Sequence, residues 1–524
     1  MDKVRLSRAD LFVAAHSFRD LGGSYKIMEK SDLMDSCLPS SPKKMYDCQR
    51  VGMTAIVSEP HVYLDYPPGT GKTRIGIEAV RHLIRAKKVR SVLVVTINSA
   101  SALGWKDQLE EYSPELECSV LSANSRENRR KEVLDFSGQV MVVTYSSLLS
   151  IMCKASSDKR GRQIDEDAAR GFSGLFDMVL FDEAREIGNP DTLRFRLCCI
   201  LADKKVRRVA MSATPFSKDP TPLWSQSFVL DGGRTMGSNF FAFRNVFYRR
   251  INVRWGNGID YKYNSTFNKH LKTLFSNLCV KYDLAECEID MPEVVSTNLL
   301  VEQSKEYEKY GELMDEGRRA IFNSGFSDLS AIENWYLVQR RLASSFIREV
   351  EVLDNLKPVV HDIDFPTNPK LDVLMPIVED CVRNGKMILY VNFIHSGDVV
   401  CKALDKLGIT YAKMYGDSNK NEEYLKFKNN PQTRVLVTHP RSGGVSLNLQ
   451  FANYMAFYEL PESPDLYYQA VHRAIRIGGK SHVFIWHTLV ENSIEVEIMR
   501  YLQEGKNLWK EILDHPEKLV GLLS

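Results

Sequence analysis

The sequence predicts an α/β protein with two lobes, each a doubly wound parallel sheet covered by helices, and a helical insertion between them. Short runs of β-branched and other apolar residues alternate with helical stretches in the front half of the chain, and this alternation returns in the rear half. Strands that are apolar along their whole length are expected where helices cover both faces of a sheet. Between residues 223 and 365 the pattern changes to helices rich in aromatic and charged residues.

The individual elements and boundaries follow from these runs. Strands are expected at residues 92–96, 140–144, 178–181 and 208–211 in the first lobe and at 387–391, 434–438, 454–458 and 482–486 in the second. Helices are expected at 302–318 and 329–350 in the insertion. The predicted organisation is an N-terminal flank (1–43), a first lobe (44–222), the insertion (223–365), a second lobe (366–508) and a C-terminal tail (509–524).

The bulk composition is that of an ordinary globular chain. Its 524 residues are 44% hydrophobic and 26% charged, and they suffice for about three domains. The formal net charge of +2 excludes a polycation, so contact with nucleic acid must depend on local charge. Ten scattered cysteines without a C-x-x-C pair predict reduced thiols. Neither a signal peptide nor a membrane span is expected, because the first residues lack an apolar core and no apolar run approaches about 18 residues. A soluble, intracellular protein is expected, with a nuclear or virus-associated location left open.

A glycine-rich segment, Tyr66-Pro67-Pro68-Gly69-Thr70-Gly71-Lys72-Thr73, lies between an apolar run and a periodic helix. Small residues let consecutive backbone N–H groups point at phosphate oxygens, and the helix N-terminus adds the positive end of its dipole. Lys72 is expected to reach the β- and γ-phosphates of ATP, and the Thr73 hydroxyl to ligate Mg²⁺. Tyr66 stands where the P-loop pattern has its first glycine, so a glycine-rich turn with a chance lysine is the alternative. The predicted ATP-binding residues of this segment are Pro68, Gly69, Thr70, Gly71, Lys72 and Thr73.

An acidic pair, Asp182-Glu183, ends the strand predicted at 178–181. At the carboxyl end of a parallel strand, Asp182 is well placed to hold Mg²⁺, and Glu183 could accept a proton from the attacking water. The alternative is an acidic pair that caps a strand-to-helix turn.

The second lobe carries two arginines three residues apart, Arg473 and Arg476. On a helix this spacing places both on one face. Guanidinium groups that reach a γ-phosphate from across a cleft accelerate other phosphate hydrolases by roughly 10³- to 10⁵-fold. An exposed basic helix face is the alternative. Gln469 of the same segment is a further predicted catalytic residue.

These segments, in this order, resemble the superfamily 2 helicases and, more narrowly, the Swi/Snf-like DNA-dependent ATPases, over about residues 43–495. The resemblance implies two RecA-like lobes that close on ATP and Mg²⁺. It also implies that Gln49, in Tyr46-Asp47-Cys48-Gln49-Arg50-Val51-Gly52, reads the adenine. The other matching segments are Gly104-Trp105, Thr144-Tyr145, Asp182 through Asn189, Met211 through Phe216, Leu223-Trp224-Ser225, Arg441 through Leu449, Ser463 through Gly478 and Ser493-Ile494-Glu495. Departures are Arg185 for histidine, Ser446 for glycine and Gly479 for glutamine, and a compact viral or phage-type member would fit the chain's size.

The predicted function is an ATP-driven motor, most specifically a DNA-stimulated ATPase that translocates on double-stranded DNA. The alternatives are a helicase that separates DNA or RNA strands and a scaffold that binds nucleic acid without hydrolysis. No membrane contact is expected, and no protein partner is predicted. The expected nucleic-acid contacts are Asn98, Trp105, Thr144 and Arg441, with a packing role as the alternative for Trp105. The basic clusters 81–90, 129–131 and 204–208 are further candidates that solvated helix faces would equally explain.

Overall fold

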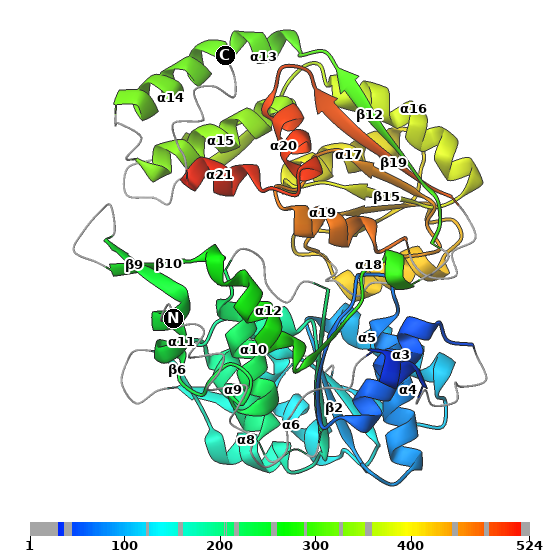
Figure 1. The fold of residues 1–524 in the computed structure, drawn as a ribbon. Coiled ribbons are helices and arrows are strands. Elements are labelled where there is room, and N and C mark those ends of the chain that lie inside the picture. The colour runs from blue at the N-terminus through cyan, green and yellow to red at the C-terminus, as the bar shows by residue number, and fades with distance from the viewer. Residues whose placement is uncertain are drawn as a thin grey trace. The chain divides into compact units, whose positions relative to one another are not determined.

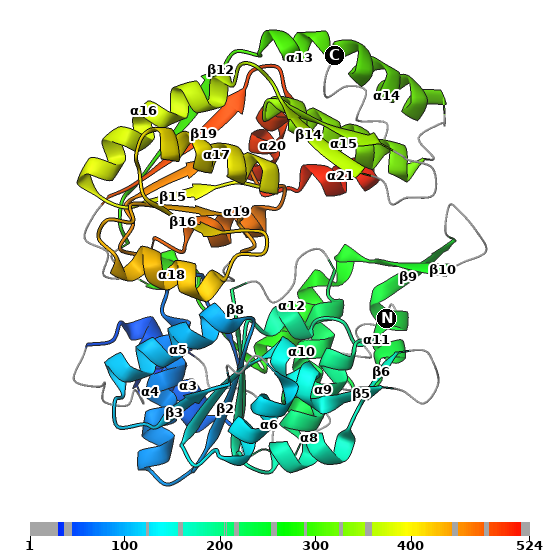
Figure 2. The same cartoon turned by 180° about the vertical axis from the view of Figure 1, so that it is seen from behind.

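The computed structural model divides the chain into two compact units, Met1–Asp290 and Met291–Ser524. Figures 1 and 2 show their elements from opposite sides. The structure describes residues 30–35, 44–121, 125–155, 161–203, 205, 207–213, 219–252, 259–287, 291–323, 328–351, 359–442, 449–475 and 482–514.

Unit 1 is built on a seven-stranded parallel sheet in the order β11-β1-β8-β7-β2-β4-β3. Its central strands are buried along nearly their whole length, as a sheet covered on both faces requires. The strands are β1 (His61–Asp65), β2 (Val92–Thr96), β3 (Cys118–Val120), β4 (Val140–Thr144), β7 (Met178–Asp182), β8 (Arg207–Ser212) and β11 (Cys279–Lys281).

Two hydrophobic cores lie on opposite faces of this sheet, because successive strand residues point to opposite sides. Val94 and Leu180 belong to one core, and their neighbours Val95 and Phe181 belong to the other. The first core is closed by α3 (Asp47–Ser58), α4 (Lys72–Arg85) and α5 (Ser99–Tyr112). The second core is closed by α7 (Tyr145–Met152), α8 (Glu166–Ser173), α9 (Leu193–Ala202), α10 (Thr221–Asp231), α11 (Phe240–Phe247) and α12 (Asn268–Ser276). The doubly wound architecture predicted for the first lobe is confirmed.

Smaller elements complete unit 1. Two antiparallel hairpins leave the main sheet, one of β5 (Cys153–Ala155) with β6 (Arg162–Ile164) and one of β9 (Tyr248–Asn252) with β10 (Ile259–Tyr263). The remaining helices are α2 (Lys30–Asp35), α6 (Arg126–Leu134) and the 3-10 helices η1 (Ala184–Ile187), η2 (Ser265–Phe267) and η3 (Ala285–Cys287).

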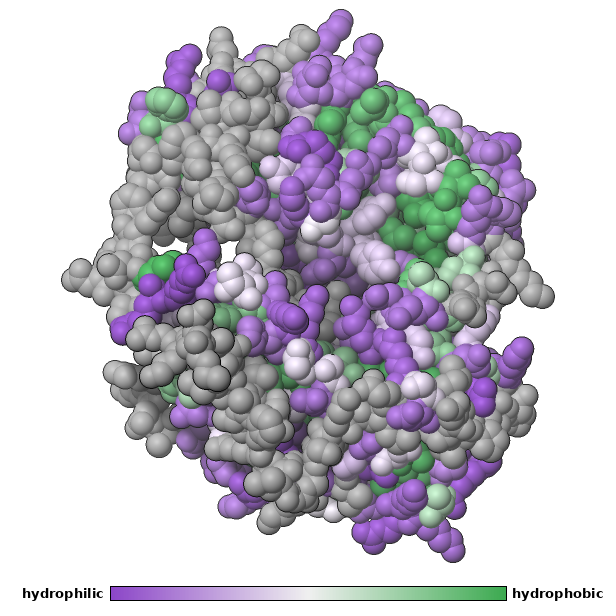
Figure 3. Space-filling view, in the orientation of Figure 1, coloured by the Kyte–Doolittle hydropathy of each residue, from purple (hydrophilic) through white to green (hydrophobic). Residues whose placement is uncertain are grey.

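Unit 2 repeats the plan with a six-stranded parallel sheet in the order β12-β19-β18-β15-β17-β16. The outer strand β12 exposes Val294, Val295 and Leu300, and apolar surface gathers over this part of the unit in Figure 3. The strands are β12 (Val294–Val301), β15 (Met387–Tyr390), β16 (Tyr411–Met414), β17 (Val435–Thr438), β18 (Tyr454–Phe457) and β19 (Val483–Val490), with a separate ribbon of β13 (Phe346–Glu351) and β14 (Val359–Asp364). The helices are α13 (Lys305–Lys309), α14 (Gly311–Asn323), α15 (Leu329–Ala343), α16 (Pro369–Asn384), α17 (Ile394–Lys406), α18 (Lys420–Asn429), α19 (Pro464–Val471), α20 (Ile494–Gln503) and α21 (Leu508–Asp514).

All eight strands expected from the sequence are present, within a few residues of their predicted ends. The stretch 223–365 is less helical than expected, because β11 extends the sheet of unit 1 and β12 extends that of unit 2. Both were missed because β11 has three residues and β12 is an exposed edge strand without a continuous buried face. The helix predicted at 329–350 is also too long. It ends at Ala343, since Ser345 adopts a left-handed conformation (φ 62°) and residues 346–351 form β13.

Among the described residues, no helix combines the length and the apolar character that crossing a bilayer requires.

Unit 2 contains a buried histidine whose charged form is disfavoured in the folded state. His487 on β19 contacts Asn298 Oδ1 at 3.0 Å and the Tyr467 hydroxyl of α19 at 2.9 Å. Burial lowers the pKa of His487 to about 4, so the folded state disfavours the charged ring. The stability that this neutral ring contributes is present above its unfolded pKa of about 6.5 and is lost as the pH falls toward 4.

We therefore expect His487→Asn, which removes the titrating ring, to flatten the loss of melting temperature between pH 7 and pH 5. Thermal unfolding of both proteins across this range measures the difference. Parallel acid profiles of wild type and variant would contradict the assignment.

Candidate active site

The glycine-rich segment forms a tight loop between β1 and α4. Gly69 and Gly71 have φ values of 80° and 84°, a left-handed conformation that suits glycine. Lys72 opens α4, and its Nζ donates hydrogen bonds to the carbonyls of Tyr66 at 2.9 Å and Pro67 at 3.1 Å. The ammonium group therefore lies over the loop, next to a helix N-terminus, where a bound phosphate would meet both charges.

The structure explains why tyrosine is tolerated at the first position of the loop. The Tyr66 side chain is fully buried in the core shared with α3 and α4. Its hydroxyl donates to the Cys48 carbonyl at 2.8 Å, and its ring lies 5.2 Å from that of Tyr282. Because the side chain points away from the loop, the backbone remains accessible to phosphate at this position.

Gln49 connects α3 to the same loop. Its Nε2 donates to the Thr70 carbonyl at 2.9 Å, and its Oε1 accepts from the Tyr46 backbone N–H at 3.2 Å. The side chain is 1% exposed. Its place beside the loop is compatible with the predicted contact to adenine, which stays a prediction.

Asp182, the last residue of β7, is buried and held by three donors. Its Oδ2 accepts from the Thr96 hydroxyl at 3.0 Å and from the Trp105 indole N–H at 2.9 Å, and its Oδ1 accepts from the Glu183 backbone N–H at 3.1 Å. Burial raises the pKa of Asp182, and the indole, the hydroxyl and the Lys72 charge oppose this rise. These contacts fix the carboxylate at the carboxyl edge of the sheet.

Glu183 follows in an unusual conformation. Its φ of 50° lies in the left-handed region, which is costly for a residue other than glycine and often marks functional sites. Burial raises the pKa of Glu183 to about 7, against the opposing charge of Lys72. A carboxyl group with this pKa can accept a proton near neutral pH.

The residues of unit 1 fit ATP and Mg²⁺ chemically. Mg²⁺ is usually held by one or two carboxylates together with phosphate oxygens and water. Asp182 supplies such a carboxylate, and Thr73 lies at the second position of α4, half-buried beside the loop. The glycine conformations provide the cradle that phosphate requires.

The arginine segment of unit 2 differs from its prediction in one respect. Helix α19 ends at Val471, so Arg473 lies beyond the helix rather than on its face. Its guanidinium is 2% exposed and donates to the carbonyls of Pro440 at 2.6 Å and Ser442 at 3.2 Å, which fixes the segment after the helix against the loop after β17. Gln469 is half-buried on α19. Arg476, Thr214–Phe216 and residues 443–448 lie outside the described residues. That the arginines and Lys72 bind the same triphosphate stays a prediction.

Three predicted nucleic-acid contacts instead have structural partners in unit 1. The indole of Trp105 is 1% exposed and donates a hydrogen bond to Asp182, which favours the alternative of a packing role inside the protein. Asn98 and Thr144 cap α5 and α7 by accepting from the backbone N–H groups of Ser101 and Ser147. Both caps lie at the carboxyl ends of β2 and β4, the same edge of the sheet as Asp182. In unit 2, Arg441 is exposed.

Many cations of the basic clusters have internal partners. Arg81 pairs with Glu78, Arg85 with Glu115 and Arg90 with Asp177. The cationic groups of the other two clusters donate hydrogen bonds to oxygens within unit 1. Arg129 donates to the Ser150 hydroxyl, and the other acceptors are backbone carbonyls: Ile151 for Arg130, Phe176 for Lys205, Ile56 for Arg207 and Leu230 for Arg208. These charges therefore help to stabilise the fold, a role that differs both from a nucleic-acid contact and from the solvated helix faces given as the alternative.

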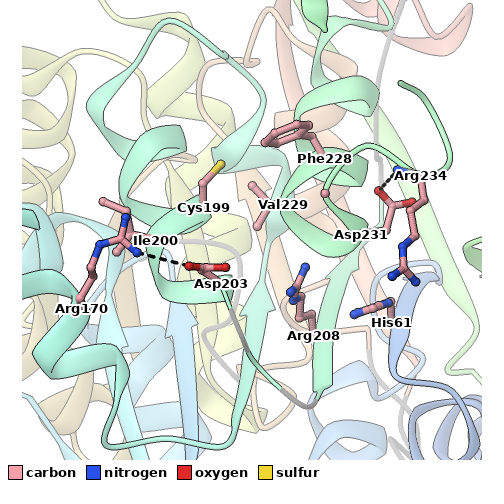
Figure 4. A pocket seen from close by; sticks show the side chains of 11 residues that line it. His61, Arg170, Cys199, Ile200, Asp203, Arg208, Phe228, Val229, Asp231 and Arg234 are labelled. Carbon is pink, nitrogen blue, oxygen red and sulfur yellow. Dashed lines mark hydrogen bonds and ion pairs between the residues drawn. The ribbon is translucent and has the colours of Figure 1, made fainter. Parts of the chain in front are cut away.

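A cavity of about 390 Å³ adjoins one of these clusters. It lies at the amino ends of β1 and β8, the opposite edge of the sheet from the phosphate loop. Figure 4 shows His61, Arg208 and Arg234 close together on one side of it. Burial, aided by the charges of neighbouring arginines, lowers the pKa of His61 to about 4.

Sequence reasoning missed the residues that hold Asp182. Thr96 ends β2 and Asp182 ends β7, and these strands are neighbours in the sheet. Both strands were predicted to be parallel and each ends in a polar residue. Because parallel strands end at the same edge of a sheet, this pattern could have predicted the contact with Thr96. Nothing local marks Trp105 as a partner 77 residues away.

Comparison with known proteins agrees with this geometry. Residues 42–217 match the model of the type III restriction enzyme res subunit, and residues 369–478 match the helicase conserved C-terminal domain. An uncharacterized ATP-dependent helicase of Mycoplasma genitalium is 23% identical over 85% of this chain and 39% of its own length. The chromodomain-helicase-DNA-binding protein 1-like of Mus musculus is 22% identical over 82% of this chain and 45% of its own. The SWI2/SNF2 ATPase core of Sulfolobus solfataricus in complex with dsDNA is 20% identical, with a TM-score of 0.39, over 93% of this chain and 97% of that one.

A doubly wound parallel sheet with a phosphate loop and an acidic pair at its carboxyl edge defines a P-loop nucleotide-binding protein. The chain belongs to the superfamily 2 helicases, in their Swi/Snf-like group. It spans about two fifths of the length of the first curated relatives that it matches.

The contact between Trp105 and Asp182 can be tested by Trp105→Phe. Hydrogen bonds to charged groups contribute about 1.5–3 kcal/mol, so urea unfolding should show a loss of this order. Because the carboxylate also loses its orientation, the affinity for Mg·ATP should fall. Trp224→Phe is the matched control, since the Trp224 indole is buried in the same unit and donates to the Gly237 carbonyl at 3.0 Å. Equal affinities for Mg·ATP in the two variants would refute the positioning role.

Proposed function

We propose that the protein hydrolyses ATP at the carboxyl edge of the unit 1 sheet and uses the energy to move along double-stranded DNA. The observation that carries this proposal is the assembly of Lys72, Asp182 and Glu183 at one edge. Burial raises the pKa of both carboxyl groups, and the Lys72 charge lowers both. Lys72 opens the helix that follows β1 and the acidic pair stands at the end of β7, so all three residues lie at the carboxyl edge of the parallel sheet.

In the proposed site, each residue has a separate task. Lys72 binds the β- and γ-phosphates, and the loop residues 68–71 surround them with backbone N–H groups. Thr73 and Asp182 hold Mg²⁺, which when bound neutralises phosphate charge. Glu183 orients the attacking water and accepts its proton. Gln49 reads the adenine from α3.

The second half of the proposed site comes from unit 2. Arg476 stabilises the transferring phosphoryl group, and Gln469 lies on the helix that precedes it. Arg473 holds the loop after β17 through its two carbonyl contacts and thereby supports this half. ATP favours a closed state of the lobes, and loss of the γ-phosphate reopens them. The proposed lobes keep the bounds expected from the sequence, 44–222 and 366–508, and β11 and β12 add one strand to each from the stretch between them.

Double-stranded DNA is the proposed track. The mouse relative is named a DNA-binding helicase, and the chain's Swi/Snf-like group supports the same partner. In this proposal Asn98 and Thr144 act through the helix N-termini that they cap, where backbone N–H groups can bind phosphate. Arg441, exposed in unit 2, contacts the backbone directly.

Two alternatives are distinguished by simple assays. ATP turnover measured without nucleic acid, and with duplex DNA, single-stranded DNA or RNA, identifies the stimulating partner. A forked substrate with one labelled strand tests for a strand-separating helicase, since ATP-dependent release of that strand would overturn translocation alone.

Glu183→Gln tests whether the chain turns ATP over. Removing a general base typically costs 10²- to 10⁴-fold, so phosphate release should fall by about this factor while ATP still binds. Equal, near-zero rates for wild type and variant would favour the non-hydrolysing scaffold.

The two arginines of unit 2 should respond differently to alanine. Arg476→Ala is expected to lower turnover by roughly 10³- to 10⁵-fold with little effect on ATP affinity or melting temperature. Arg473→Ala should instead destabilise the fold, because it leaves two buried carbonyls without their donor. Lost ATP binding with a retained fold in Arg476→Ala would count against a role limited to the transition state.

A further inference from the structure

Positive charge is concentrated in one stretch of unit 1. Residues 232–282 contain nine lysines and arginines and a single acidic residue, Asp260, whereas the whole chain has 69 basic and 67 acidic residues. This stretch forms α11, the β9–β10 hairpin, α12 and β11. The hairpin projects from the body of unit 1 in Figure 1, and the surface over it is mostly hydrophilic in Figure 3.

The hairpin places like charges opposite each other. Arg249 and Lys262 are register partners in the antiparallel ladder, so both occupy the same face. Both are exposed, and neither forms an ion pair with any carboxylate among the residues whose side chains the structure describes. Directly opposed like charges destabilise a two-stranded ladder. Asp260, the one acidic residue of the stretch, stands two residues before Lys262 on β10, and its side chain is outside those that the structure describes.

Specific contacts fix the hairpin on its neighbours. The Arg244 guanidinium of α11 lies 3.8 Å from the centre of the Tyr261 ring on β10. The Tyr263 hydroxyl donates to Asn268 Oδ1 at 2.7 Å, at the start of α12. Lys269 and Lys272 are exposed on that helix. We call Arg249, Arg250, Lys262, Lys269 and Lys272 the basic arm.

The basic arm differs from the clusters at 129–131 and 204–208, whose cations mainly bond oxygens inside unit 1. Its charges face solvent on a hairpin and a helix with fixed positions. A row of phosphates would relieve the repulsion between Arg249 and Lys262 and would need no base-specific contact.

We propose that the basic arm binds the phosphate backbone of the DNA track, outside the segments that match the family's motifs. This inference rests on the proposed function and identifies a second contact surface for the same partner. The arm supplies affinity and no catalytic group, so its loss should change the DNA concentration needed for stimulation and leave turnover at saturating DNA unchanged.

The test compares two variants with equal change of charge. Arg249→Gln/Lys262→Gln removes the opposed pair of the arm. Lys402→Gln/Lys406→Gln removes two exposed lysines one turn apart on α17 of unit 2, outside every basic cluster considered above. Binding to a fluorescent DNA duplex is measured between 50 and 200 mM salt, together with ATP turnover and melting temperature.

For the arm variant we expect weaker binding and a salt slope lower by about 2, since each phosphate contact contributes about 0.9. Between 50 and 200 mM salt its affinity should therefore fall about tenfold less than that of the wild type. Half-maximal stimulation should need more DNA, while the melting temperature stays close to that of the wild type because both side chains are exposed. The control variant should resemble the wild type.

Several results would overturn the proposal. An unchanged salt slope in the arm variant would do so, as would an equal change in the control. A lowered melting temperature that accounts for the weaker binding would assign the arm a structural role. In that case Lys269→Gln/Lys272→Gln provides an independent pair, and an unchanged salt slope in that variant would also count against the proposal. Wild-type binding to an acidic peptide but not to duplex DNA would assign the surface to a protein. A wild type that neither binds DNA nor responds to it would defeat the proposed function itself, whereas DNA binding that the arm variant retains would defeat the arm alone.

Discussion

The candidate active site depends on one buried charge, the Asp182 carboxylate at the carboxyl edge of a parallel sheet. Moving a carboxylate away from water is costly unless donors replace the lost hydration. Thr96 and Trp105 supply two of these donors from β2 and α5. The site is therefore coupled to the packing of the sheet and its first layer of helices. A change in that packing reaches the carboxylate without touching the phosphate loop.

A nearly neutral chain can still present strong local charge. In unit 1, most of the arginines and lysines of two basic clusters are turned inward to carbonyls and hydroxyls at element ends, where they support the fold. The β9–β10 hairpin and α12 instead carry a group of solvent-facing cations close together. Net charge alone does not distinguish these two uses. The two uses are distinguished by where each cation lies relative to unsatisfied carbonyls and to neighbouring carboxylates.

The sequence was sufficient for the fold class and for the central strands, because buried parallel strands are apolar throughout and leave a strong local pattern. It was insufficient for β11 and β12, which are short or exposed and owe their place to pairing with distant strands. At the candidate site, the glycines, Lys72 and the acidic pair were predicted because each motif consists of consecutive residues. The role of Trp105 stayed open between a surface contact and internal packing, since a tryptophan beside a glycine in a motif is compatible with both. Only the packing of α5 on the sheet decides between these alternatives.

The hydrogen bond between Trp105 and Asp182 also has a practical consequence. The emission of an indole depends on the charge and hydrogen bonding around its ring, and this indole touches the carboxylate proposed to hold the metal ion. Trp105 is one of six tryptophans in the chain, and the Trp224→Phe background would remove another indole buried in the same unit. The protein thus carries an intrinsic fluorophore beside its candidate active site. Changes in tryptophan fluorescence could therefore report occupation of the nucleotide site without an attached dye.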